Sequence, residues 1–141
     1  MINETLKLTG RVTVLLNDEV VQEIDNLVVT DGKGYVASRM KDATATVMSH
    51  MSVGTGSTAA AASDSALDAE AGRVALTSTS VTGAAVTYSA SFPAGTGTGG
   101  LTEAAILNAS SGGTMLCRTV FSVVNKQSAD AMTIQWQVSA S

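Results

Sequence analysis

Residues 131–139, AMTIQWQVS, carry the pattern that decides the fold. Ile134, Trp136 and Val138 alternate with the polar residues between them. Because successive side chains of a β-strand point to opposite faces, this alternation predicts a half-buried strand with the single tryptophan inside.

Working outward from this strand, we find further short stretches of the same kind. The segments RVALTSTSV, AAVTYSASF and GTMLCRTVF end at Val81, Phe92 and Phe121, and TATVMSHMSV covers 44–53. Near the N-terminus, two strands up to Leu16 and from Val20 to Ile24 flank the turn signal Asn17-Asp18. Turns are also predicted at SSGG (110–113) and NKQSAD (125–130).

These segments amount to about seven or eight strands at the spacing of a sandwich or barrel. We therefore predict a mainly β chain that forms one domain over 1–141, an antiparallel β-sandwich of jelly-roll type. One short helix is expected near 31–41, capped by Thr30 or Asp31, with Tyr35, Val36 and Met40 at helical spacing. Residues 54–72 are expected to form a long surface loop, and 93–100 a Gly/Thr-rich loop.

The composition excludes several classes of function. The 141 residues are 45% hydrophobic but only 14% charged, with a net charge of −4 and no basic run, which argues against nucleic-acid binding. No apolar stretch approaches the roughly 20 residues that span a bilayer, and no signal peptide is visible. Cys117 is the only cysteine, so we expect no intrachain disulfide and synthesis in a reducing cytoplasm. Low surface charge favours a chain that buries part of its surface against partners.

One stretch resembles a dinucleotide-binding loop. In FPAGTGTGGLTEAAIL (92–107), Gly95, Gly97 and Gly100 have suitable spacing, and LTEAAIL could form a short helix. However, Pro93 ends the preceding strand, no carboxylate lies near position 120, and strands and helices do not alternate elsewhere. We interpret the stretch as a loop between strands and predict no cofactor.

No residue of the sequence is predicted to be catalytic or to bind a metal. His50 is the only histidine and lacks a glycine-flanked serine, so a packed or surface role is expected. Cys117 is interpreted as a small buried hydrophobic residue, with Arg118 on the opposite face of its strand. Asp64, Asp68 and Glu70 lack the register of a calcium loop. We therefore expect that the protein is not an enzyme.

Glu103 lies in the apolar surroundings of LTEAAIL. A buried carboxylate needs a partner, and Arg73, Arg118, Lys126 or backbone amides could supply it. We interpret Glu103 as a structural anchor beneath the glycine loop.

The segments GLTEAAILNASSGGTMLCRTVFSVVNKQSADAMTIQWQVS (100–139) and MSVGTGSTAAAASDSALDAE (51–70) carry a further pattern. The motifs are T-E-A-A-I, G-G-T-M-L, R-T-V-F, N-K, T-I-x-W and D-x-A-L-x-x-E, the last formed by Asp64, Ala66, Leu67 and Glu70. Over roughly 47–139 the chain resembles small virion structural proteins of tailed bacteriophages.

Within that group the chain is most similar in size, β architecture and acidic balance to jelly-roll cement (decoration) proteins of podophage heads. The resemblance implies an oligomer, such as a homodimer, on the capsid exterior, bound to the major capsid protein and stabilising the head against internal DNA pressure. The N-terminal strand (1–9) and the 54–72 loop are the expected arms. One alternative is a tail, baseplate or tail-fibre protein, from whose version Ala105 departs. The other is a carbohydrate-binding sandwich, whose usual aromatic platform is hard to build from Trp136, Tyr35 and Tyr88 alone.

Overall fold

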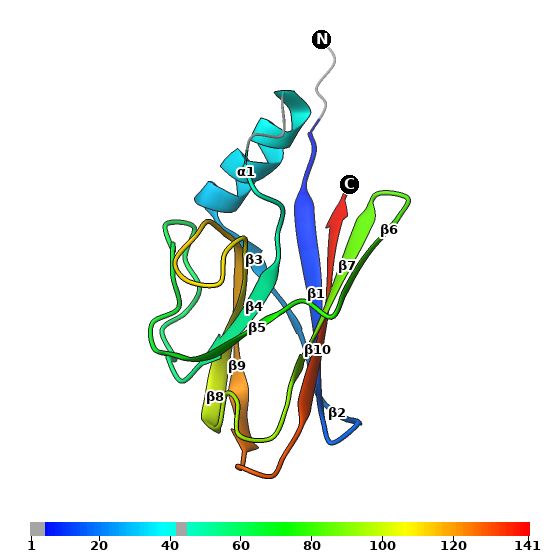
Figure 1. The fold of residues 1–141 in the computed structure, drawn as a ribbon. Coiled ribbons are helices and arrows are strands. Elements are labelled where there is room, and N and C mark those ends of the chain that lie inside the picture. Colours follow the sequence, from blue (N-terminus) through cyan, green and yellow to red (C-terminus); the bar gives the residue numbers. More distant parts are fainter. Residues whose placement is uncertain (1–4, 42–44) are drawn as a thin grey trace.

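The computed structural model, which describes residues 5–41 and 45–141, contains two five-stranded antiparallel sheets and one short helix (Figure 1). The prediction of a mainly β sandwich is therefore confirmed. Sheet A has the strand order β2-β1-β10-β7-β6, and sheet B has the order β3-β9-β8-β4-β5.

The strands of sheet A are, in chain order, β1 (Leu8–Leu16), β2 (Glu19–Asp25), β6 (Ser78–Thr82), β7 (Ala85–Phe92) and β10 (Met132–Ala140). The strands of sheet B are β3 (Leu27–Val28), β4 (His50–Gly54), β5 (Glu70–Ala75), β8 (Gly99–Leu107) and β9 (Met115–Lys126). The first strand pairs with the last in sheet A, and β3 pairs with β9 in sheet B.

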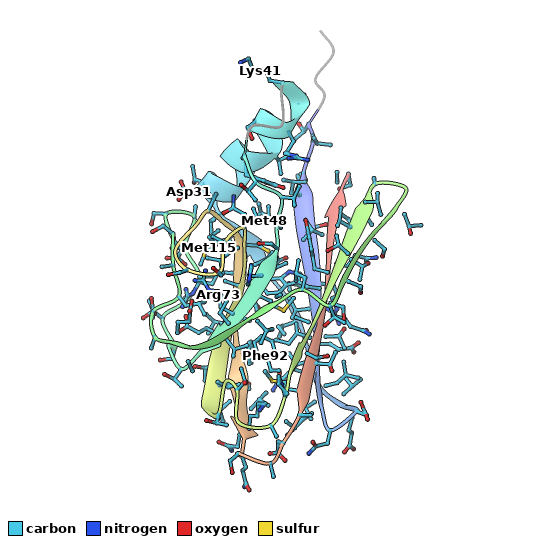
Figure 2. The ribbon with its side chains drawn as sticks, viewed as in Figure 1. Asp31, Lys41, Met48, Arg73, Phe92 and Met115 are labelled. Atoms are coloured by element: carbon cyan, nitrogen blue, oxygen red, sulfur yellow. The ribbon has the colours of Figure 1, made fainter. Side chains whose placement is uncertain are left out.

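The main core lies between the two sheets and follows the predicted alternation of β10. Ile134 and Trp136 point inward and are fully buried, while Gln135 and Gln137 are exposed. On β1, Val12 stands opposite Trp136, and on β7 Tyr88 stands opposite it from the other side. Figure 2 shows Phe92, which is also fully buried, among the side chains between the sheets.

The helix is confirmed as α1 (Thr30–Lys41), at one end of the sandwich (Figure 1). Thr30 and Asp31, the expected caps, both lie inside its first turn, and the first helical hydrogen bond runs from Lys33 N–H to the carbonyl oxygen of Val29. Tyr35 and Val36 pack against the main core. Met40, which was expected on the same face, is 85% exposed.

Three predictions about strands were wrong. RVALTSTSV is not one strand: β5 belongs to sheet B and β6 to sheet A, so the chain crosses between sheets at 76–77. No strand was predicted at LTEAAIL, which was considered only as a possible helix, but it forms the centre of β8, where neighbours on both sides supply the backbone hydrogen bonds. The strand expected over 44–53 begins only at His50, and Thr44 lies outside the described residues.

The expected turns are confirmed with small shifts in their bounds. Asn17 and Asp18 both have positive φ, 50° and 67°, as a two-residue hairpin of the favoured hand requires. Segments 108–114 and 127–131 connect β8 to β9 and β9 to β10. The long loop covers 55–69 because β5 begins at Glu70, and the Gly/Thr-rich loop covers 93–98 because Gly99 and Gly100 belong to β8.

Candidate functional site

The two sheets differ in what covers their outer faces. On sheet B, part of the face that points away from the sandwich is buried beneath the chain itself. Ala105, Leu107 and Met115 form a second small core with Val29, and Leu67 of the 55–69 loop packs against it. Sheet B is therefore buried on both faces along most of β8, which explains the long run of buried residues in that strand, whereas Val123 of β9 is 54% exposed.

A buried ion pair holds this loop on sheet B. The carboxylate of Glu103 and the guanidinium of Arg118 are both fully buried, with Nη2 3.0 Å and Nε 3.2 Å from Oε1. The same carboxylate accepts hydrogen bonds from the backbone N–H groups of Gly56 (2.8 Å), Asp68 (2.9 Å) and Ala69 (2.8 Å). Both ends of the loop are thus tied to one side chain.

Arg118 adds further ties from its own side. Its Nη1 lies 2.9 Å from Asp64, its Nη2 lies 3.4 Å from Asp68, and it donates to the carbonyl oxygen of Thr58 at 3.0 Å. Burial by itself lowers the pKa of the guanidinium, but its hydrogen bonds to Glu103 and Asp64 outweigh that effect and the pKa lies above its usual value. The buried charge of Arg118 is therefore compensated by carboxylates, and the cluster ties the 55–69 loop to β9.

The prediction that Glu103 is a structural anchor was correct, but its predicted position beneath the glycine loop was wrong. Its partners are Arg118 of β9 and backbone amides, as expected, but these amides belong to the 55–69 loop and not to the glycine loop. Arg73 and Lys126 serve elsewhere. Arg73 donates to the carbonyl oxygens of Ala109 and Gly112, and Lys126 donates to that of Pro93.

The remaining singled-out residues occupy ordinary structural positions. His50 is half-buried at the start of β4, with Nδ1 2.7 Å from the hydroxyl of Ser49. Cys117 is fully buried in the main core, and burial raises the pKa of its thiol above the usual range. Asp64 and Asp68 face Arg118, and Glu70 pairs with Arg73 at 2.7 Å.

The glycine loop is a turn between the two sheets. Gly95 and Gly97 have φ values of 85° and 64°, and β8 follows directly. A dinucleotide-binding turn leads into a helix whose N-terminus binds the pyrophosphate. Here a strand occupies that position.

In contrast to sheet B, the outer face of sheet A is not covered by any segment within residues 5–41 and 45–141. It presents rows of small hydroxyl and amide side chains across the sheet. We call this surface the outer face and define it by Thr9, Thr13, Thr87, Ser89, Thr133, Gln135, Gln137 and Ser139. Arg11 lies among them and is paired with Asp25 at 3.3 Å. The result is a polar surface whose central strands carry few charges, with Glu23 and Asp25 on the neighbouring strand β2.

A second surface lies at the helix end of the molecule. A groove between the start of β1 and α1 is lined by apolar side chains, including Leu6, Val36, Ala37 and Met40. Leu6 is 71% exposed here. An aromatic platform of the kind that binds sugars is not formed by the predicted residues, because Trp136 and Tyr88 are buried in the core.

No known protein family, curated protein or solved structure matches this chain. Within 5–41 and 45–141, no helix is both long enough and apolar enough to cross a membrane.

Proposed function

We propose that this protein is a capsid cement protein, which binds the outer surface of the major capsid protein shell of a tailed bacteriophage and stabilises the head against internal DNA pressure. The observation that supports this role best is the difference between the sheets. One outer face is partly covered by the chain's own loop, and the other is left as a polar surface with few charges on its central strands.

The chemistry of the outer face suits binding to another protein. Its threonine, serine and glutamine side chains can donate and accept hydrogen bonds without the desolvation cost of buried charges. The face is built on paired central strands of a sheet, so little conformational entropy is lost when it docks. Because many copies can bind one shell, the overall stabilisation of the shell can be large although each contact is modest.

The expected arms need revision. The loop at 55–69 does not project as an arm, because Glu103 and Arg118 fasten it to sheet B. In the N-terminal segment, Lys7 exchanges backbone hydrogen bonds with Ser141, and Leu8 and Thr9 pair with β10. Residues 1–4 lie outside the described residues, so only this part of the N-terminal arm remains a proposal.

Binding to shells tests the role directly. We expect the protein to co-sediment with expanded shells of its phage, and the double substitution Gln135→Lys/Gln137→Lys to weaken binding at least about tenfold by placing two charges on the outer face. Ser110→Lys/Ser111→Lys, on an exposed turn that faces elsewhere, is the matched control and should bind normally. Deleting residues 1–4 in the same assay tests the arm.

Three results would contradict the proposal, the first of them from electron cryo-microscopy of the virion. Density for this chain on the tail or baseplate would refute the cement role in favour of a tail component. Equal shell binding by the outer-face variant and the wild type would show that another surface binds the capsid. Specific binding on a glycan array, with no affinity for shells, would favour a carbohydrate-binding module.

A further inference from the structure

The edge strand β6 offers backbone hydrogen-bonding groups that its own sheet does not use. β6 pairs with β7 on one side only, and all five of its residues, Ser78–Thr82, are exposed. In Figure 1 it lies at the border of sheet A, with no other element of the described chain beyond it. An edge of this kind can accept a further strand.

Proteins usually protect such edges with charges, proline or a covering loop. β2, the other edge of sheet A, carries Glu19, Glu23 and Asp25, so two copies would bring like charges together. In sheet B, β3 has only two residues, and β5 carries Glu70 and Arg73.

β6 lacks these protections. Its sequence, STSVT, contains no charged residue and no proline, and three of its five residues are β-branched, which favours strand pairing. Among the four edge strands in the described part of the chain, β6 is thus the one suited to pair with a copy of itself.

We infer that β6 pairs antiparallel with β6 of a second copy of this chain and joins the two A sheets into one continuous sheet. A two-fold axis through Ser80 is the register that pairs all five residues. It places Ser80 opposite Ser80, Thr79 opposite Val81, and Ser78 opposite Thr82. Any other two-fold centre leaves residues of β6 unpaired.

The side chains fit this register on both faces of the sheet. Thr79 and Val81 stand beside the inward-facing Tyr88 and Val86 of β7. Val81 is 70% exposed in the single chain, and pairing would cover it with the partner's β-branched threonine. On the other side, Ser78, Ser80 and Thr82 form hydroxyl pairs and extend the polar outer face across the dimer.

The length of β6 sets the strength of the contact. Five residues at about 3.4 Å each give roughly 17 Å of paired strand, which places the interface among small, transient ones. We therefore expect a dimer that dissociates on dilution. This inference deepens the proposed function, because a dimer would present two outer faces to the shell, but its test uses the isolated protein.

Cysteine cross-linking tests the register. In the proposed dimer the Cα atoms at position 80 lie about 4.5–5.5 Å apart, within the range of a disulfide, whereas those at position 78 are offset by roughly 13 Å along the strands. Ser80→Cys is expected to form disulfide-linked dimers at least about tenfold faster than Ser78→Cys, an equally exposed control on the same side of β6. The native Cys117 is fully buried and does not interfere.

Sedimentation of charged variants gives an independent measurement. Val81→Lys should abolish the concentration-dependent dimer, whereas Val20→Lys, a matched substitution on the other edge, should leave it intact. Equal cross-linking by the two cysteine variants, or undiminished dimerisation of Val81→Lys, would overturn the inference. A chain that binds shells but stays monomeric at every concentration would refute only the dimer, and a dimer without shell affinity would refute only the cement role.

Discussion

Replacing Glu103 by glutamine should release the 55–69 loop and destabilise the whole chain. The substitution keeps the size of the side chain and removes its charge. In the wild type, Oε2 accepts the N–H groups of Gly56 and Ala69, while Oε1 accepts that of Asp68 and two donors from Arg118. A glutamine has only one oxygen, so its NH₂ group must face at least two of these donors in either orientation.

The magnitude follows from the burial of the pair. Both side chains are fully buried, and breaking such a pair typically costs about 3–5 kcal/mol, because one charge is left without its compensation. Asp64 and Asp68 still face Arg118, which favours the lower end of that range. At roughly 3 °C per kcal/mol for a chain of this size, the lower end of that range corresponds to a fall of about 9 °C in the thermal midpoint.

Urea unfolding and thermal melting measure this loss, and amide hydrogen exchange locates it. Exchange at Gly56 and Ala69 should accelerate more than exchange in the central strands of sheet A. Glu70→Gln is the matched control, because the Glu70 side chain is 38% exposed in its pair with Arg73, and such pairs contribute at most about 1 kcal/mol. If Glu103→Gln cost no more than Glu70→Gln, the fastening role assigned to Glu103 would be wrong.

Two further predictions concern the helix and the alkaline limit of stability. Gly32→Ala should lower the thermal midpoint, because the added methyl group would overlap the carbonyl oxygen of Leu116. Gly34→Ala, at a position that faces open space, should instead stabilise the helix by about 0.5–1 kcal/mol. Equal effects of the two substitutions would contradict the close packing of α1 on β9. Burial raises the pKa of the Cys117 thiol from its ordinary 9.0, and that of Tyr88 from 10.0 to about 12, so the unfolded chain loses these protons at lower pH than the folded one. This contribution to stability is complete below about pH 8 and declines as pH rises from about 9 to about 12, so the urea midpoint should fall across that pH window. In Cys117→Ala the fall should be smaller in the lower part of the window. Midpoints that rise with pH would refute the assignment.

Local patterns in the sequence were sufficient to predict the parts of the fold that depend on neighbouring residues. Alternation around Trp136 predicted both faces of β10, because side-chain direction in a strand follows from backbone geometry alone. The turn at Asn17-Asp18 was predicted for a similar reason, since these residue types tolerate positive φ. The need of a buried carboxylate for partners predicted that Glu103 would be anchored.

What the sequence could not supply was the assignment of strands to sheets and of loops to faces. LTEAAIL lacks polar alternation because sheet B is covered on both sides along most of β8, and a short apolar run cannot be distinguished from a helix by periodicity. The division of RVALTSTSV between two sheets depends on β4 and β7, which lie elsewhere in the chain.

The sequence by itself determined that the chain forms a β-sandwich, that Trp136 lies inside and that charge is scarce, because these properties depend on residue type and local spacing. Only the tertiary structure decided that one outer face is partly covered and the other is open. That difference arises from contacts between residues far apart in sequence, such as Asp64 with Arg118, whose pairing requires the completed fold.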